Sequence, residues 1–224
     1  MKLIRISAVL LVTAISFLGA QKASAQVEIG VKVSPSITYQ RTLAPKGIDL
    51  KSDGASVGIG FGVIADYFFG TNYAFHSGVI FNVKGGSFTS QYTDAFGNNI
   101  KFESENSLHY IEIPLAIKLY TNEVAPDIRV YFNAGGTLNT LVGARLDGEK
   151  ADEEGEKYTK QFNLFEVGAI VGAGAEWQLG ESTKFFGGLT YQHGLTNVND
   201  SLGGEDSKIE LKNSLFSLDF GIKF

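Results

Sequence analysis

The ionisable residues of this chain lack the spacings that metal or catalytic sites need. The three histidines, His76, His109 and His193, lie far apart in the sequence and are not spaced as metal ligands, so we expect no metal site. Gly58-Ile59-Gly60-Phe61-Gly62 has the composition of a phosphate-binding loop, but it lies within a strand-like alternation and no helix follows it. With no cysteine, the chain also has no thiol nucleophile. We therefore predict neither a cofactor nor an enzymatic activity.

Charged residues recur instead at alternate positions within apolar stretches. They are Glu28, Lys32, Asp66, Lys84, Glu112, Lys118, Arg129, Glu166, Glu176, Asp219 and Lys223. Five of these residues are basic and six are acidic, and charges that leave water must pair or become neutral. We predict that they line the interior of a closed structure as an ion-pair network. The expected partners of Glu112, Glu166 and Glu176 across this interior are Lys84, Lys118 and Arg129.

The elements that position these residues are β-strands, because apolar and polar side chains alternate with period two. Eight segments show this alternation: residues 27–33, 57–67, 73–83, 110–119, 129–142, 165–178, 185–192 and 216–224. A tilted strand crosses a bilayer with about 9–11 residues, and these segments have lengths of that order. No segment of the chain has the 18 consecutive apolar residues of a membrane-spanning helix.

The connections between these segments alternate in length. The long, polar ones are residues 43–54, 92–107, 146–161 and 196–213, and the short ones are residues 69–72, 121–127 and 180–183. Short turns on one rim and long loops on the other are typical of outer-membrane barrels. We predict an all-β fold, an eight-stranded antiparallel up-and-down transmembrane β-barrel formed by one domain, residues 26–224. Its N- and C-termini would be periplasmic and its long loops extracellular.

Side-chain size favours a membrane barrel over a soluble barrel of the lipocalin type, which would face its apolar residues inward. Here the polar face carries many glycines, which suits a narrow interior, and the apolar face carries large side chains, which suits lipid. Aromatic residues also gather near both strand ends, as in interfacial girdles. Near the short turns they are Tyr67, Phe68, Phe69, Tyr73, Phe75, Tyr120, Tyr131, Phe132, Trp177, Phe185 and Phe186; near the long loops they are Tyr39, Phe88, Tyr110, Phe162 and Tyr191.

The N-terminal residues 1–25 have the composition of a cleavable signal peptide. Lys2 and Arg5 precede an apolar stretch, and Ala23 and Ala25 form an A-x-A cleavage site. The chain would thus be exported. The formal net charge of −5 and the pI near 5.3 argue against nucleic-acid binding, which needs a basic face.

Four motifs carry a resemblance to a known family. The chain ends in alternating Phe216, Leu218, Phe220, Ile222 and Phe224, a pattern similar to the C-terminal assembly signal of outer-membrane barrels. The other three are Tyr110-Ile111-Glu112-Ile113-Pro114-Leu115, Gly172-Ala173-Gly174-Ala175-Glu176 and Tyr191-Gln192-His193-Gly194-Leu195, which leads into the last loop. Together they make residues 26–224 resemble the small, PorT-like outer-membrane β-barrel family common in Bacteroidota. The resemblance implies residence in outer-membrane lipid and lipopolysaccharide, insertion by the barrel-assembly machinery and possible envelope protein partners.

An eight-stranded barrel is just wide enough for side chains to fill its interior. We therefore expect a non-enzymatic envelope protein with a filled, ion-paired lumen, which acts structurally or through its long loops. Two alternatives remain: an accessory subunit of a secretion or transport complex, to which one branch of the family is tied, and a narrow diffusion pore. An outer-membrane enzyme would need His109 and His193 in register with a serine at the rim.

Overall fold

The computed structural model describes residues 27–43, 51–93, 99–151, 154–199 and 210–224. The predicted signal peptide, residues 1–25, and its cleavage site at Ala23 and Ala25 lie outside the described residues. None of the helices among the described residues is long and apolar enough to cross a membrane.

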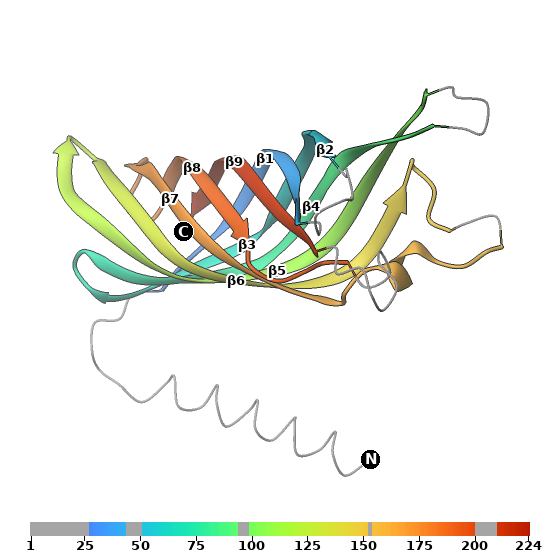
Figure 1. Ribbon diagram of the computed structural model, residues 1–224. Helices are drawn as coiled ribbons and strands as arrows, with labels where there is room; N and C mark the ends of the chain where they lie inside the picture. Colours follow the sequence, from blue (N-terminus) through green and yellow to red (C-terminus); the bar gives the residue numbers. More distant parts are fainter. Residues whose placement is uncertain (1–26, 44–50, 94–98, 152–153, 200–209) are drawn as a thin grey trace, which may run out of the picture.

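Eight long strands form the molecule (Figure 1). They are β1 (Val27–Leu43), β3 (Ser56–Gly70), β4 (Tyr73–Thr93), β5 (Asn99–Ala125), β6 (Ile128–Leu146), β7 (Phe165–Gln178), β8 (Lys184–Gly194) and β9 (Glu210–Lys223). Each pairs antiparallel with the next along the chain, and β9 pairs with β1, so the sheet closes into an up-and-down barrel. The short β2 (Lys51–Gly54) precedes β3 and pairs with β4. The predicted eight-stranded barrel is thereby confirmed.

Alternation along each strand separates an outward apolar face from an inward polar face. On β1, Ile29 and Val31 are 54% and 53% exposed, whereas Glu28 between Val27 and Ile29 is 4% exposed. Val31 pairs with Val63 of β3 and with Ile222 of β9, so the outward apolar residues continue around the barrel. Large apolar side chains on the outside and charges on the inside are the reverse of a soluble protein, and they fit a barrel surrounded by lipid.

The two ends of the barrel differ, as the loop lengths predict. At one end, called here the short-turn end, β3 joins β4 through residues 71–72, and β5 joins β6 through Pro126 and Asp127. Asp127 has φ 64°, a left-handed conformation that a tight turn requires. Val27 pairs with Tyr67 near the end of β3, and the Phe224 amide donates to the Ile29 carbonyl, so both described chain ends also lie at this end. The opposite end is called the long-loop end.

The predicted loop at residues 92–107 is mostly strand. β4 continues to Thr93 and β5 begins at Asn99, so the two strands extend as a hairpin beyond the barrel wall (Figure 1). The β5–β6 pairing stops at Asn106 and Leu146. Apolar and polar residues do not alternate steadily over residues 92–107, and the sequence pattern therefore did not predict these strands.

Five of the predicted girdle aromatics point into the barrel instead of toward lipid. Phe68, Tyr120, Tyr131 and Phe186 belong to a buried cluster near the short-turn end with Ile64, Ala74 and Ile80. Tyr110, near the long-loop end, is fully buried. Each has the same parity as buried polar or charged residues on its own strand, such as Asn133 for Tyr131 and Thr190 for Phe186, so alternation places it inside. Tyr67, Phe69, Tyr73, Phe132, Trp177 and Phe185 remain on the outside.

Candidate functional site: the filled lumen

Three cations and three anions meet inside the barrel near the short-turn end, and all of them except the partly buried Lys184 are buried. This short-turn cluster consists of Glu28, Asp66, Glu176, Lys118, Lys184 and Lys223. Lys118 Nζ lies 3.1 Å from Asp66 Oδ2 and 3.0 Å from Glu176 Oε1. Lys223 Nζ lies 2.9 Å from the same Asp66 oxygen and 2.6 Å from the same Glu176 oxygen, and it also contacts Glu28 at 2.8 Å. The formal charges of the cluster cancel.

Tyr120 joins the two acids of this cluster. Its hydroxyl lies 3.0 Å from Asp66 Oδ2 and 2.9 Å from Glu176 Oε1, and it accepts a hydrogen bond from Lys223 Nζ at 3.2 Å. The Lys118 ammonium lies 3.9 Å from the centroid of the Tyr131 ring. A cation over an aromatic face is stabilised by the ring quadrupole, most strongly where water is excluded. The cluster is thus solvated by protein groups in place of water.

A second group of charges lies nearer the long-loop end, and its formal charges do not cancel. Lys84 Nζ is 3.6 Å from Glu112 and 3.5 Å from Glu166, so one cation serves two carboxylates. Side-chain amides supply the missing donors: Gln192 donates to Glu112 at 2.8 Å and Asn213 donates to Glu166 at 3.2 Å. Hydrogen bonds to a charged acceptor replace part of the lost hydration.

Lys32 and Asp219 lie between these two groups. Their atoms Nζ and Oδ2 are 3.5 Å apart. Asp219 also accepts hydrogen bonds from Thr190 at 2.7 Å and from Ser217 at 3.0 Å. All the expected lumen charges except Arg129 therefore lie in ion pairs with one another or with Lys184.

Arg129 differs from this expectation. Its guanidinium donates to the Thr71 carbonyl at 3.0 Å, to Asn72 Oδ1 at 3.2 Å and to the Thr121 carbonyl at 3.2 Å. It stacks over the Tyr120 ring, and none of the ion pairs between described residues involves it. Arg129 pairs in register with Glu176 of β7, but its guanidinium turns toward Thr71 and Asn72 and ties the β5–β6 hairpin to the β3–β4 turn.

Glycines on the inward face make room for the interior aromatic rings. A Cβ on Gly174 would lie 2.4 Å from the Tyr131 hydroxyl, and one on Gly188 would lie 2.5 Å from it. On β9, a Cβ on Gly221 would come within 2.5 Å of the Phe186 ring. Large rings set against glycines of neighbouring strands fill a narrow barrel to the density of a protein core. The inward glycines are therefore packing positions.

An apolar cluster closes the interior at the long-loop end. It consists of Leu108, Tyr110, Leu141, Ala144, Val198 and Leu211, with Tyr158 and Phe162 packed against it. Val198 belongs to the segment 197–199, called here the strap, which crosses from β9 to residues 162–163. The Val198 amide donates to the Leu211 carbonyl at 2.8 Å, and the Val198 carbonyl accepts from the Asn163 amide at 2.9 Å. The sequence pattern did not indicate this closure.

The space left in the middle of the barrel is small. A cavity of about 20 Å³ lies among Lys32, His76, Lys118, Tyr131 and Asp219 and other inward side chains. That volume holds about one water molecule. The lumen at this level is filled by side chains.

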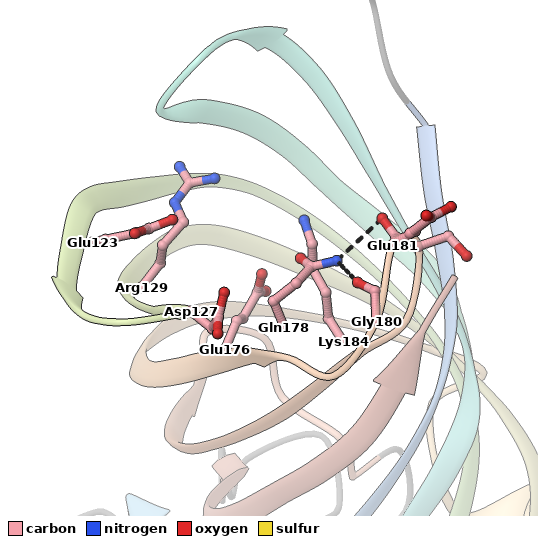
Figure 2. Close-up of a pocket in the computed structure, with 9 residues that line it drawn as sticks. Glu123, Asp127, Arg129, Glu176, Gln178, Gly180, Glu181 and Lys184 are labelled. Atoms are coloured by element: carbon pink, nitrogen blue, oxygen red, sulfur yellow. Dashed lines mark hydrogen bonds between the residues drawn. The ribbon is translucent and has the colours of Figure 1, made fainter.

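A larger hollow opens at the short-turn end (Figure 2). This vestibule has a volume of about 450 Å³ and is lined by Glu123, Asp127, Arg129, Glu176, Gln178, Gly180, Glu181, Ser182 and Lys184. Gln178 Nε2 donates to the carbonyls of Gly180 and Glu181 and holds the β7–β8 turn at its edge (Figure 2). Glu176 belongs both to the vestibule wall and to the short-turn cluster, so the ion pairs form the floor of the vestibule.

The histidines do not come together. His76 points inward and its Nδ1 contacts Asp66 Oδ1 at 2.5 Å. His109 on β5 packs edge-on against Phe81, and His193 on β8 contacts the Tyr191 hydroxyl at 2.8 Å. Because β6 and β7 separate β5 from β8, His109 and His193 do not share a site.

Sequence reasoning missed Lys184, Tyr120 and the two amides Gln192 and Asn213 as members of the network. Lys184, Tyr120 and Gln192 have the parity of inward residues on their strands, so the alternation was sufficient to find them. Lys184 was missed because it directly follows the β7–β8 turn, before the apolar alternation of β8 becomes evident.

Residues 19–200 match the model of a family described as the outer membrane protein beta-barrel domain. This chain belongs to that family. The outer-membrane barrel described above is therefore supported by sequence as well as by its topology, and the protein is located in the outer membrane. No curated protein sequence matches it.

Solved structures of outer-membrane barrels have a similar fold. Neisserial surface protein A shares 13% identity with this outer-membrane barrel, covers 89% of it and 97% of its own chain, and superposes with a TM-score of 0.54. OprG from Pseudomonas aeruginosa shares 12% identity, with coverage of 88% and 95% and a TM-score of 0.49. At these identities the similarity shows the fold alone.

Proposed function

We propose that this protein is a non-enzymatic component of the outer membrane that acts structurally or through its long loops, and that its lumen conducts no solute. The observation that carries the proposal is the filled interior. Ion pairs and aromatic rings fill the barrel near the short-turn end, and the strap and its apolar cluster fill it at the long-loop end. Among the described residues, the histidines that could have served an enzyme lie apart. In this proposal the barrel lies among lipid and lipopolysaccharide after insertion by the barrel-assembly machinery, and its membership of an outer-membrane barrel family supports the lipid environment.

The orientation belongs to this proposal. With its termini periplasmic, the short-turn end and the vestibule face the periplasm, and the strap and the long hairpin of β4 and β5 face outward. The motifs at 110–115 and 172–176 and the terminal Phe224 support an assignment to the small, PorT-like outer-membrane barrel family common in Bacteroidota.

The β4–β5 hairpin favours a second candidate, an accessory subunit of a secretion or transport complex. Residues 99–104 of β5 pair with β4 on one side, and no strand among the described residues pairs with them on the other, so their backbone offers a free edge. A free edge can receive a strand from a partner protein.

Affinity purification from native outer membranes tests both candidates. The variant replaces residues 91–101 by a two-residue Asn-Gly turn, which keeps the pair Ser90 and Phe102 in register. Subunits that co-purify stoichiometrically with the wild type and are lost from this variant support the accessory role. Purification of the wild type without such subunits supports the independent envelope protein. Heat-modifiable gel mobility, a sign of a folded barrel, is the control for the variant.

A further inference from the structure

The outward surface of β8, β9 and β1 changes from apolar to polar and then to positively charged toward the long-loop end. Ile37, Phe216 and Leu189 belong to its apolar part and are between 56% and 64% exposed. The next residues of the same parity toward the long-loop end are Tyr39 of β1, Ser214 of β9 and His193 of β8. Ser214 pairs with Tyr39 on one side and with His193 on the other. Beyond them, Arg41 of β1 pairs with Lys212 of β9. Two cations thus lie side by side where the apolar surface ends.

Arg41 is held in one orientation by neutral groups. Its Nε donates to the Ser214 hydroxyl at 2.9 Å and its Nη2 donates to the Gly194 carbonyl at 2.6 Å. No ion pair between described residues includes Arg41. A guanidinium has five N–H donors in a rigid fork, and these two bonds use two of them. The remaining donors and the full positive charge are available to an anionic ligand.

The neighbouring rings form a fixed layer below the two cations. The Tyr191 hydroxyl contacts His193 Nδ1 at 2.8 Å and the Tyr39 hydroxyl at 3.3 Å, and the Tyr191 ring packs on Phe216 with centroids 4.5 Å apart. Tyrosine is enriched where lipid meets water, because its ring is apolar and its hydroxyl is polar. This layer therefore marks the boundary between the acyl chains and the headgroups.

Lys212, unlike Arg41, forms an ion pair with an acid on its own strand. Its Nζ lies 2.9 Å from Glu210 Oε2, and the two side chains are 20% and 46% exposed. An exposed ion pair of this kind contributes little to stability, so its exchange for a stronger anion costs little. Phosphate offers Arg41 a bidentate acceptor and offers Lys212 a second negative oxygen.

We propose that Arg41 and Lys212, above the Tyr39–Tyr191–His193 layer, bind the phosphate of a lipid headgroup. A cation that faces lipid at the edge of the hydrocarbon finds its anion in the headgroup layer, because no protein acid neutralises Arg41 among the described residues. The assignment of this headgroup to the outer leaflet rests on the proposed function, which places the long-loop end outside. The site binds the protein to the lipid around it independently of the lumen.

The test measures lipid retention by the full-length protein in zwitterionic detergent micelles, with native mass spectrometry after addition of bis-phosphorylated lipid A. The double variant Arg41→Gln/Lys212→Gln removes both charges and keeps the polar character of the side chains. Loss of one charge-assisted hydrogen bond corresponds to about tenfold in affinity, so we expect at least about tenfold weaker binding. The matched control is Arg145→Gln, because Arg145 is an exposed arginine at the long-loop end of β6.

Lower lipid A binding by the double variant, with near-normal binding by Arg145→Gln, supports the site. Equal losses in both variants would overturn it, since general rim charge would then explain the binding. If the wild type bound chemically dephosphorylated lipid A as tightly as bis-phosphorylated lipid A, the proposal would also be overturned. Full competition by inorganic phosphate at a concentration equal to that of lipid A would identify free phosphate as the ligand and overturn the lipid site. Heat-modifiable mobility and proteolysis of intact cells report on the barrel and its orientation separately, so failure of the proposed function remains distinguishable from failure of the site.

Discussion

At the scale of single residues, the interior charges act as a set whose members depend on one another. Asp66 is fully buried and contacts Lys118, Lys223, His76 and the Tyr120 hydroxyl. A buried ion pair contributes little net stability compared with an apolar pair, but loss of one partner leaves an uncompensated charge in a medium of low dielectric constant. The consequences of a mutation therefore depend on the charge that it leaves behind.

Lys118→Met should destabilise the barrel more than the double variant Lys118→Met/Glu176→Gln. The single change leaves three acids of the short-turn cluster with two cations, whereas the double change restores equal numbers. Removal of one partner of a buried pair typically costs about 3–5 kcal/mol. Urea unfolding of the refolded protein in detergent, followed by heat-modifiable mobility, measures the order of the midpoints. A double variant less stable than the single variant would refute the pairing.

In the group around Lys84, loss of the single cation should destabilise the barrel more than loss of one of its two acids. Lys84→Met leaves Glu112 and Glu166 without a cation, whereas Glu166→Gln leaves one acid facing one cation. We therefore expect Lys84→Met to lower the unfolding midpoint clearly more than Glu166→Gln does. Equal midpoints for the two variants in the same assay would show that the amides of Gln192 and Asn213 suffice to hold both acids.

At the scale of the strands, alternation predicts which face each side chain occupies but not which residues meet across the barrel. Parity alone places Asp66, Lys118 and Glu176 inside. That Lys118 meets Glu176 and Lys223 meets Asp66 depends on the register between strands, which the local pattern does not contain. The strap was unpredictable for a related reason: Val198 is a single apolar residue in a polar segment, and its partners Leu108 and Leu211 lie on two different strands.

The last strand closes the barrel, and its outward face should be sensitive to charge. The Phe224 amide donates to the Ile29 carbonyl at 2.8 Å, and Phe220, which pairs with Val33, is 44% exposed on the lipid side. A lysine or arginine at mid-membrane costs about 2–4 kcal/mol and an acid costs less. We expect Phe220→Asp to reduce the amount of protein in the outer membrane, and deletion of Phe224 to do the same, as judged by immunoblots of membrane fractions.

Phe220→Leu is the control for this strand, since it keeps an apolar side chain on the lipid face. Normal outer-membrane levels of both Phe220→Asp and the Phe224 deletion would contradict the role of the terminal strand as lipid-facing wall and assembly signal.

At the scale of the whole molecule, the two ends define an orientation that proteolysis can test. A protease added to intact cells should cut only within residues 43–54, 92–107, 146–161 or 196–213. Cleavage within 121–127 should require a permeabilised outer membrane, because this turn belongs to the short-turn end. Mass spectrometry of the fragments identifies the cut sites. Cleavage at 121–127 in intact cells would reverse the orientation and place the vestibule outside.

A closed interior is the central feature of this barrel. The short-turn cluster with its aromatic rings, the pair of Lys84 with two acids and the strap occupy three levels along the barrel. A pore would need an aqueous path past all of them. The most direct measurement is the conductance of the purified wild-type protein in planar lipid bilayers. The account predicts no stable channels of porin-like conductance, and large, steady, open conductance would contradict it and make the diffusion pore the better description.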